Sequence, residues 1–447
     1  MRKKRTIIIG LDGAPFRLIE DFSKNGVMPN IGKIIESGTF KQMTSSIPEV
    51  SSVAWSSIIT GTNPGEHGVF GFTDLAKNTY RLSFTNFNSL KRKAFWEENN
   101  QKRHIVINVP STYPARELNG ILVSGFVAPN AKKAVYPDSF LSFLNEIDYR
   151  FDVDSSKAHE SMKLFMKDLN KTNEARISLY RHLWHQDWDT FMLVFTGSDR
   201  LMHFLWDAYG NPAHEFYRDF LGYFNRVDEI IGEIANELKE EDNLIIISDH
   251  GFESLEYDVY LNAILKISGL FKLQDEKRLS LSNIDTETRL FALDPSRIYV
   301  HTKERYPRAR VNNEDKKYIL KDIESLFKSL EFSGRKVIKD VFRKEEIYKG
   351  PYMDDAPDIV LVGEKGFNLK ASLGSKEIFS RSVFAGKHTQ HDAFILLNRP
   401  FQNEIPDNVN VSDVINVLNR LKKDPSALSG PQDETFLREK RPEVSIN

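Results

Sequence analysis

Two patterns in the 447-residue sequence predict an α/β fold built on a doubly wound, mostly parallel sheet flanked by helices. Over the first two thirds of the chain, short runs of almost wholly apolar residues alternate with long helical patterns. Apolar runs of this kind are typical of parallel strands that helices cover on both faces. After about Gly269 the pattern changes to short strands around one helix, and this change predicts a smaller α+β cap insertion.

The predicted elements follow from these patterns in chain order. Near-continuous apolar runs predict strands over residues 5–11, 104–109, 121–126, 191–195, 243–248 and 393–397. Helical periodicity predicts helices over residues 28–38, 161–186, 214–238 and 411–421, the first of them closed by a glycine. In the cap, we expect strands over residues 297–301 and 358–362 and a helix over residues 314–330.

These elements divide the chain into four segments. We expect a core of residues 1–268, a cap of residues 269–381, a continuation of the core over residues 382–425 and a tail of residues 426–447. From Lys422 onward the sequence is rich in Pro, Glu, Lys and Ser, so we expect this end of the chain to be weakly ordered.

Composition and charge exclude several classes of protein. The chain carries 61 basic and 63 acidic residues, so no excess of positive charge indicates a nucleic acid polymer or an anionic membrane as partner. It contains no run of ~18 apolar residues that would span a membrane, and residues 7–11 are too short for the apolar part of a signal peptide, so we expect a cytoplasmic protein. With no cysteine, any metal site must use His, Asp, Glu or hydroxyl groups. The oligomeric state is left open.

Acidic residues follow three of the predicted strands. Asp12 comes directly after the first strand, Asp199 follows the strand at 191–195, and Asp249 and His250 follow the strand at 243–248. Ligands of open α/β sheets bind outside the carboxyl ends of the strands, so these side chains are expected at one edge of the sheet. Each acid alone is also typical of a turn or a helix N-cap. Three carboxylates brought together would repel one another, and a bound cation is the simplest compensation.

Spacing within two of these motifs fits metal ligands. In DRLMH, Asp199 and His203 stand at positions i and i+4, which places both side chains on one face of a helix. The alternative is an N-cap aspartate with a half-buried histidine. Asp249 and His250 point in opposite directions if they share a strand, but a turn at Gly251 would direct them toward two adjacent metals. A further histidine near the C-terminus is needed to complete six nitrogen and oxygen ligands, and His388 and His391 in AGKHTQHD are both candidates.

A nucleophile candidate lies at the start of a short helix. The segment VAWSSIIT predicts a buried helix that ends at Gly61, with Ser51 and Ser52 at its N-terminus. A serine there is commonly only an N-cap, worth ~1 kcal/mol. The same position, however, offers free N–H groups that suit a phosphate, and a hydroxyl next to a metal loses its proton readily and attacks phosphorus. The pattern does not distinguish the two serines.

Taken together and in order, the motifs GLDG, SSVAW with TGTNPGEHGV, TGSDRLMH, SDHGF and GKH resemble one known family. The chain resembles the type I phosphodiesterase/nucleotide pyrophosphatase group of the alkaline phosphatase superfamily over about residues 5–265 and 385–400. The resemblance implies an alkaline-phosphatase-like core and two divalent metal ions, usually zinc. Sets of Asp and His also accept Mn or Fe.

The resemblance assigns roles to the candidate residues. It implies that one metal is held by Asp12, Ser51, Asp249 and His250, and the other by Asp199, His203 and His388. The family pattern G-x-H matches residues 386–388, which favours His388 over His391. The family pattern P-x-V-T-x-P-A-W aligns with PEVSSVAW and puts its threonine on Ser51 rather than Ser52.

The sequence also departs from the family and its relatives. Eukaryotic nucleotide pyrophosphatases have an asparagine that contacts a phosphoryl oxygen, and the gap-free alignment puts Phe72 at that position. Sulfatases need a Pro and an Arg beside the nucleophile, and SSVAW has neither in place. Cofactor-independent phosphoglycerate mutases carry their insertion before the later metal motifs, whereas here the insertion follows Asp249 and His250.

We therefore expect a metal-dependent hydrolase of small-molecule phosphate esters. The expected bond is a phosphodiester or a pyrophosphate, cleaved through a covalent phosphoserine at Ser51. One alternative is a phosphomonoesterase or phosphonate hydrolase that uses the same site. An alternative of another class is an inactive, metal-binding homologue with a binding or regulatory role.

Overall fold

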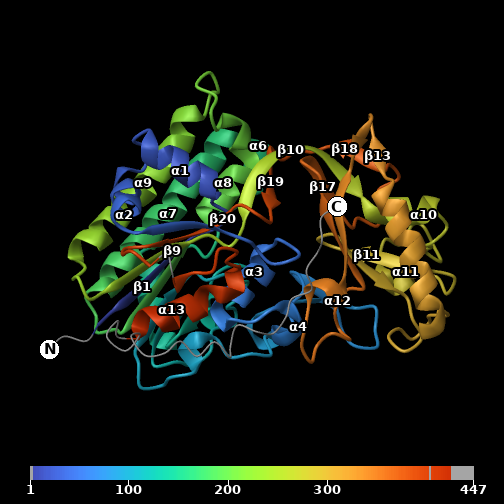
Figure 1. The fold of residues 1–447 in the computed structure, drawn as a ribbon, viewed down its shortest axis with the longest axis horizontal. Helices are drawn as coiled ribbons and strands as arrows, with labels where there is room; N and C mark the ends of the chain where they lie inside the picture. The colour runs from blue at the N-terminus through green and yellow to red at the C-terminus, as the bar shows by residue number, and fades with distance from the viewer. Residues whose placement is uncertain (1–3, 402–403, 424–447) are drawn as a thin grey trace.

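The computed structural model describes residues 4–401 and 404–423. It divides into a large α/β core and a smaller cap that stand side by side, joined by the long strand β10 (Gly251–Tyr260) across the top of Figure 1. The predicted tail of residues 426–447 lies outside the described residues. Among the helices of the described ranges, none is both long enough and apolar enough to cross a lipid bilayer.

The core is built on an eight-stranded sheet with the order β2-β20-β9-β1-β8-β5-β6-β7. Its strands are β1 (Thr6–Leu11), β2 (Thr39–Met43), β5 (His104–Ile107), β6 (Gly120–Val123), β7 (Val135–Tyr136), β8 (Thr190–Phe195), β9 (Asn243–Ile247) and β20 (Ala393–Leu397). The five neighbouring strands β9, β1, β8, β5 and β6 run parallel. The outer strands β20, β2 and β7 pair antiparallel. The predicted doubly wound, mostly parallel sheet is confirmed.

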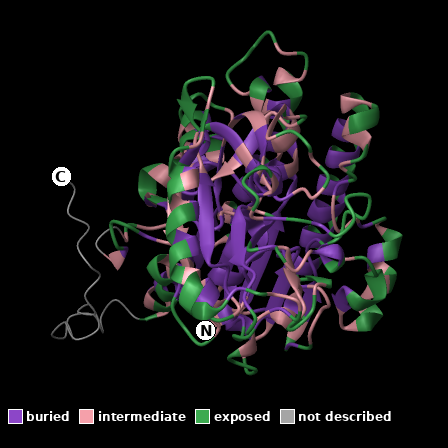
Figure 2. Ribbon diagram, turned by 90° about the vertical axis from the view of Figure 1, so that its right-hand side faces the viewer, coloured by how far each residue is buried: buried purple, intermediate pink, exposed green. Residues whose placement is uncertain are grey.

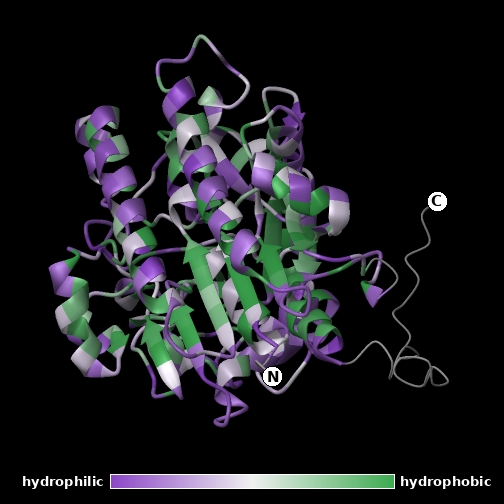
Figure 3. Ribbon diagram, turned by 90° about the vertical axis from the view of Figure 1, so that its left-hand side faces the viewer, coloured by the Kyte–Doolittle hydropathy of each residue, from purple (hydrophilic) through white to green (hydrophobic). Residues whose placement is uncertain are grey.

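Alternating side chains of each central strand serve the two faces of this sheet. Ile7 and Ile9 of β1 belong to one buried cluster, and Ile8 belongs to the other. The first cluster is covered by α1 (Phe16–Lys24), α2 (Pro29–Ser37), α7 (Met162–Trp184), α8 (Gly197–Leu205) and α9 (Tyr217–Glu237). The opposite face is covered by α3 (Ser51–Thr60) and α13 (Val414–Lys422). Figure 3, seen from the side of the core, shows hydrophobic strands behind helices that carry hydrophilic residues on their outer sides, and Figure 2, seen from the side of the cap, shows buried strands surrounded by exposed helices and loops.

The cap contains its own four-stranded antiparallel sheet, in the order β11-β12-β16-β15. These strands are β11 (Leu290–Leu293), β12 (Arg297–Val300), β15 (Ile338–Arg343) and β16 (Ile359–Gly363). Helix α11 (Asn313–Lys328) packs on this sheet through Ile319, Ile323 and Phe327. The cap is therefore α+β, as the change in sequence pattern predicts.

A second small sheet connects core and cap. Strand β10 pairs with β17 (Gly366–Lys370), β18 (Phe379–Arg381) and β19 (Gly386–Thr389). Helix α10 (Leu261–Ile267) follows β10, and its residues share the buried cluster of the cap. The hydrophobic core of the cap thus draws on residues that precede Gly269, while the segment boundaries given above stay a prediction.

The remaining α-helices and β-strands of the described chain are short. They are α4 (Pro64–His67), α5 (Leu141–Glu146), α6 (Lys157–Glu160), α12 (Lys344–Ile347), β3 (Thr73–Leu75), β4 (Leu82–Phe84), β13 (Glu331–Phe332) and β14 (Arg335–Lys336). Several predicted strands extend past the observed ones: β5 ends at Ile107 rather than at residue 109, and β6 ends at Val123 rather than at residue 126. The next residues turn away, with the Ser124 amide bonded to the carbonyl of Ala134 and the Gly125 amide bonded to the carbonyl of Val109.

Candidate active site

The sheet order explains how distant motifs meet. Strand β1 lies between β8 and β9 and runs parallel to both, so their carboxyl ends form one continuous edge. Asp12 follows β1, and Asp249 and His250 follow β9. Helix α8 begins just after β8 and carries Asp199 in its first turn. All three acidic motifs are therefore placed at the same edge, as the sequence predicts.

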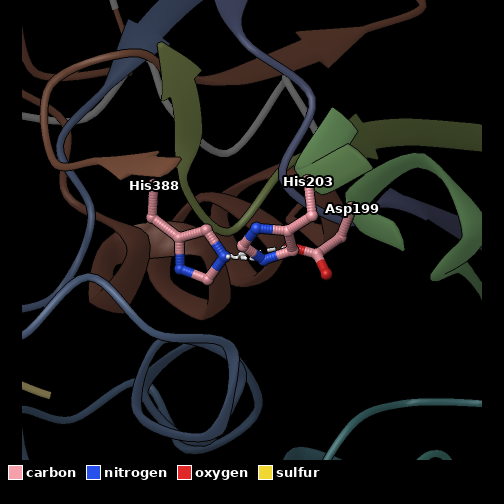
Figure 4. Close-up of side chains that lie close together, drawn as sticks. All are labelled: Asp199, His203 and His388. Atoms are coloured by element: carbon pink, nitrogen blue, oxygen red, sulfur yellow. Dashed lines mark hydrogen bonds and ion pairs between the residues drawn. The ribbon is translucent and has the colours of Figure 1, made fainter. Parts of the chain in front are cut away.

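Three of the candidate ligands form one close group, drawn in Figure 4. His388 Nε2 lies 3.0 Å from Asp199 Oδ1 and 3.0 Å from His203 Nε2. His203 Nε2 lies 3.5 Å from Asp199 Oδ1, one helical turn earlier on α8. The predicted i, i+4 pair is thus on one face of the helix, and β19 brings His388 to it. We call Asp199, His203 and His388 the histidine group.

Backbone carbonyls fix the orientation of both histidines in this group. The Nδ1 atom of His203 lies 3.1 Å from the carbonyl oxygen of Gly386. The Nδ1 atom of His388 lies 2.9 Å from the carbonyl oxygen of Glu49. A carbonyl only accepts, so each Nδ1 carries the proton and, in the neutral ring, each Nε2 presents a lone pair. Two lone pairs facing one another at 3.0 Å repel unless a proton or a cation lies between them.

A second group surrounds the serine hydroxyl. Ser51 Oγ lies 3.3 Å from Asp12 Oδ1 and 3.3 Å from His250 Nε2. His250 Nε2 in turn lies 3.4 Å from Asp249 Oδ2 and 3.8 Å from Asp12 Oδ1. The Nδ1 atom of His250 faces the carbonyl oxygen of Gly251 at 3.1 Å, so its Nε2 also points inward. We call Ser51, Asp12, Asp249 and His250 the serine group; Asp199 Oδ1 connects it to the histidine group, at 3.9 Å from His250 Nε2.

The alternatives left open by the sequence lie elsewhere. His391 is exposed, and it belongs to neither group of candidate ligands in the described chain. Ser52 is buried, and its hydroxyl has no hydrogen-bond partner among the described residues. Ser51 is also no N-cap, because Val50 occupies that position and makes no side-chain bond to the helix. The geometry therefore favours Ser51 and His388 as members of the site.

The chemistry of this donor set fits cations. Asp12, Asp249 and His250 are completely buried, and the Oδ2 atoms of Asp12 and Asp249 have no hydrogen-bond partner in the described structure. A buried, unpaired carboxylate oxygen is costly unless something compensates it. Burial, together with the nearby charges of Asp249 and Asp199, raises the pKa of Asp12 well above its ordinary value. The site therefore contains oxygen and nitrogen lone pairs that no hydrogen-bond donor of the described structure satisfies, and a cation would bind to them.

The histidine group differs in its electrostatics. Burial works to raise the pKa of Asp199, but His203, His388 and Arg200 outweigh it and lower that pKa below its ordinary value. Burial lowers the pKa of His203 to about 4, so its ring is neutral at pH 7 and able to bind a metal. Burial works to lower the pKa of His388, yet its hydrogen bond to Asp199 and the charge of that carboxylate raise it overall.

Two glycines allow the close approach of these groups. Gly13 has a φ of +72°, and a Cβ there would lie 3.1 Å from His250 Cε1. Its amide donates to Asp249 Oδ1 at 3.0 Å and so orients that carboxylate. The turn expected at Gly251 is not present: β10 begins at this residue, and its missing side chain makes room for β19, since a Cβ would lie 2.5 Å from Thr389 Oγ1.

With this geometry in place, the comparison with known families is informative. A family model described as type I phosphodiesterase / nucleotide pyrophosphatase matches residues 6–391. The chain belongs to this family. It is accordingly a hydrolase of the phosphoesterase class within the alkaline phosphatase superfamily. Among curated proteins, no sequence matches it.

Solved structures confirm the fold of this family member. Phosphonoacetate hydrolase from Sinorhizobium meliloti 1021, in complex with phosphonoacetate, has a TM-score of 0.63 at 15% identity, over 92% of this chain and 94% of that chain. Murine ectonucleotide pyrophosphatase / phosphodiesterase 5 has a TM-score of 0.54 at 13% identity, over 94% of this chain and 95% of that chain. At such identities the likeness establishes the alkaline-phosphatase-like fold alone.

Sequence reasoning missed two residues beside the site of this type I phosphodiesterase family member. Arg200 bonds Asp199 Oδ2 at 3.1 Å through Nη1, and its Nη2 bonds Asp152 Oδ2 at 2.8 Å. It stands in the quoted motif DRLMH, where its adjacency to a predicted ligand is the available signal. Glu49 stands in PEVSS, two residues before Ser51, and lines a cavity next to the histidine group.

Phe72, which the gap-free alignment puts at the position of the pyrophosphatase asparagine, packs on the outer side of this arrangement. Its ring packs against that of Phe126, with the centroids 5.9 Å apart. The guanidinium of Arg200 lies over the other aromatic ring of this pair, 4.5 Å from the Phe126 centroid. A line of contacts therefore runs from Phe72 through Phe126 and Arg200 to Asp199.

Proposed function

We propose that this protein is a two-metal hydrolase that cleaves phosphodiester or pyrophosphate bonds in small molecules through a covalent phosphoserine at Ser51. One observation carries the proposal. The serine hydroxyl lies 3.3 Å from two buried candidate ligands, Asp12 and His250, in a site where two histidine Nε2 atoms face each other at 3.0 Å. This combination of a nucleophile with unpaired nitrogen and oxygen donors suits metal-assisted attack on phosphorus.

The two groups divide the proposed metals between them. The serine group would hold one ion and the histidine group the other, with zinc as the expected metal and Mn or Fe as the alternatives that the same donors accept. Ions in such a pair lower the pKa of a bound hydroxyl and neutralise charge on the phosphoryl oxygens.

The residues of the chain then position the reactants. Ser51 is the first residue of α3, and the first N–H groups of a helix have no partner within it, so they are free to bind phosphoryl oxygens. The Ser51 oxygen forms a bond to phosphorus while the bond to the leaving oxygen breaks, and the hydroxyl proton passes through solvent water to that leaving oxygen. Water later displaces Ser51 from phosphorus, which restores the hydroxyl and releases the phosphorylated product.

Helix α3 is held in place by a structural histidine. His67 is completely buried, and its Nε2 lies 2.9 Å from Ser57 Oγ on α3. Its Nδ1 accepts from the amide of Val69 at 3.2 Å, so the ring is neutral and its Nε2–H donates to the serine. Burial lowers the pKa of His67 to about 3, so at any pH well above 3 the ring stays neutral and keeps its hydrogen bond to Ser57.

Phe72 favours a second candidate function, hydrolysis of a phosphonate or a phosphomonoester on the same site. Its side chain has no hydrogen-bond donor, whereas nucleotide pyrophosphatases of this family use an asparagine there. The likeness to phosphonoacetate hydrolase supports this candidate only at the level of the fold.

Paired substrates test these proposals. The purified protein is treated with a chelator, reloaded with Zn or Mn, and assayed with bis-p-nitrophenyl phosphate, p-nitrophenyl phosphate and phosphonoacetate. We expect metal-dependent cleavage that is fastest for the diester. Faster cleavage of the monoester or the phosphonate would favour the second candidate. Bound metal without cleavage of any of the three substrates would contradict both candidate functions and would favour an inactive, metal-binding homologue.

A further inference from the structure

A short segment of the cap contacts the chain on both sides of helix α3. It consists of residues 348–352, which follow α12, and we call it the docking segment. Before α3, the hydroxyl of Tyr348 donates to the carbonyl oxygen of Ile47 at 2.7 Å. After α3, the amide of Tyr352 donates to the carbonyl oxygen of Gly65 at 3.0 Å. Figure 1 shows α12 of the cap next to α4 of the core, where these contacts are made.

The docking segment and α4 approach each other closely, backbone to backbone. The amide of Lys349 donates to Asn63 Oδ1 at 3.1 Å. A Cβ on Gly65 would lie 2.5 Å from the carbonyl oxygen of Lys349, and a Cβ on Gly350 would lie 2.6 Å from the carbonyl oxygen of Gly65. Both glycines are therefore needed for this approach, because any side chain at either position would push the two segments apart.

The connection that leads directly into α3 is held from two directions. It consists of residues 47–50, which we call the nucleophile loop. From the core, His388 Nδ1 lies 2.9 Å from the carbonyl oxygen of Glu49. From the cap, Tyr348 donates to the carbonyl oxygen of Ile47. A proposed metal ligand and a residue of the cap thus fix the same short loop.

The ring and the hydroxyl of Tyr348 make separate contacts. The ring is buried in an apolar cluster with Phe70, Ala356 and Val360, and its centroid lies 5.3 Å from that of the Phe70 ring. The hydroxyl extends from this cluster to the carbonyl of Ile47. Burial raises the pKa of Tyr348 well above its ordinary value, so the hydroxyl keeps its proton and remains a donor. Loss of the hydroxyl alone would therefore release the loop while the ring keeps its packing.

We propose that Tyr348 is a positioning residue for the reaction: it holds the nucleophile loop from the cap and so sets the position of the Ser51 oxygen relative to the metal ligands. This rests on the proposed function, since it takes Ser51 as the nucleophile. The attacking oxygen must stand in line with the leaving oxygen, and a displacement of about 1 Å can lower a rate by about 100-fold. Docking of the cap is thus a condition for full activity.

A pair of tyrosine variants tests the assignment. Tyr348→Phe removes the hydroxyl and keeps the ring. The control is Tyr260→Phe, which removes a hydroxyl 2.9 Å from Ser380 Oγ in the sheet that connects core and cap. Both are assayed with bis-p-nitrophenyl phosphate at a temperature at which all the proteins are folded. In Tyr348→Phe we expect kcat and kcat/KM to fall together, on the order of tenfold, which is the signature of an interaction lost from the transition state.

The control separates positioning from a general loosening of the cap. We expect Tyr260→Phe to keep the kinetic constants of the wild type. Metal content, measured by atomic spectroscopy, should be equal in all three proteins, because neither substitution alters a proposed ligand. A contact that only joined cap and core would lower the temperature of unfolding and leave kcat unchanged. An unchanged kcat in Tyr348→Phe, an equal fall in Tyr260→Phe, or a loss of metal in Tyr348→Phe would therefore overturn the proposal.

Hydrogen exchange tests the same contact without turnover. Peptides that cover residues 44–54 should take up deuterium faster in Tyr348→Phe than in the wild type, and at the wild-type rate in Tyr260→Phe. Equal uptake in Tyr348→Phe and the wild type would overturn the proposal even if activity falls. If the wild type cleaves no diester, the proposed function fails instead, and the uptake still decides whether Tyr348 holds the nucleophile loop.

Discussion

His203 Nε2 and His388 Nε2 face each other at 3.0 Å, although 185 residues separate them in the chain. Both rings are held from behind by backbone carbonyls, those of Gly386 and Glu49. The pair is therefore rigidly presented as two nitrogen donors, with Asp199 Oδ1 as the third ligand atom, 3.0 Å from His388 Nε2.

Replacement of His388 should remove one of the proposed metal ions. In His388→Ala the histidine group keeps only Asp199 and His203, which is too few protein ligands for tight binding. We expect metal stoichiometry, measured by atomic spectroscopy after dialysis, to fall by half, with loss of diesterase activity. The control is His391→Ala, which alters an exposed histidine in the same segment. If His391→Ala loses the metal and His388→Ala keeps it, the ligand assignment is wrong.

Arg200 should strengthen metal binding without touching the metal. Its bond to Asp199 Oδ2 leaves Oδ1 directed at the two histidines. In Arg200→Met that orientation is lost, and we expect metal affinity to fall by roughly 10–100-fold, as for other groups that support a ligand. The control is Arg181→Met, which removes an exposed ion pair with Glu233. Competition with a chromogenic chelator measures both, and equal affinities would refute this role.

Metal affinity should rise with pH. The pKa values of Asp12 and His388 are both raised, so in the metal-free protein these groups keep protons at pH values where the ordinary groups have lost them. A metal must displace those protons, so its apparent affinity increases as the pH rises through these pKa values and levels off above them. His203, with a pKa of about 4, contributes to this dependence only near that pH.

Calorimetry measures this effect directly. Titration of the metal-free protein in buffers of different ionisation enthalpy reports the number of protons released with each ion. We expect net release at neutral pH. Proton uptake, or an affinity that falls between weakly acidic and neutral pH, would be inconsistent with the raised pKa values.

A glycine pair tests the backbone of the site. Gly13→Ala places a Cβ at a φ of +72°, 3.0 Å from Phe252 Cε2, so we expect a loss of about 1–3 kcal/mol in the free energy of unfolding, together with weaker metal binding. Gly222→Ala on α9 meets no atom within 4 Å and should instead stabilise the protein by about 0.4–1 kcal/mol. Denaturant unfolding measures both. If Gly13→Ala is as stable as the wild type, the backbone at residue 13 accommodates the added Cβ and the expected strain is absent.

The sequence predicts the acidic strand ends because their signals are local. Asp12 and Asp249 each follow an apolar run, and Asp199 and His203 have helical spacing, so their placement at one edge needs only the general behaviour of parallel sheets. The choice between His388 and His391 depends on long-range contacts, namely the pairing of β19 with β10 and the carbonyl of Glu49. The sequence pattern around His388 and His391 carries no information about these long-range contacts.

The connection to the cap is the least predictable part of the fold. Strand β10 follows the ligand motif directly, but its sequence mixes polar and apolar residues and gives no clear period. Its partners come from residues 366–370, 379–381 and 386–389, which are remote in sequence. The cavity beside Glu49 depends on these pairings, so it is visible only in three dimensions.

The most direct test of the central claim is to locate the phosphoryl group on the enzyme. The metal-loaded protein is mixed with bis-p-nitrophenyl phosphate, quenched in acid and mapped by peptide mass spectrometry, alongside Ser51→Ala and Ser52→Ala. We predict a phosphorylated adduct on Ser51 in the wild type and in Ser52→Ala. In Ser51→Ala we predict no adduct and a fall in activity of about 10³-fold or more, with metal still bound. An adduct on Ser52, or turnover that survives in Ser51→Ala, would contradict the account.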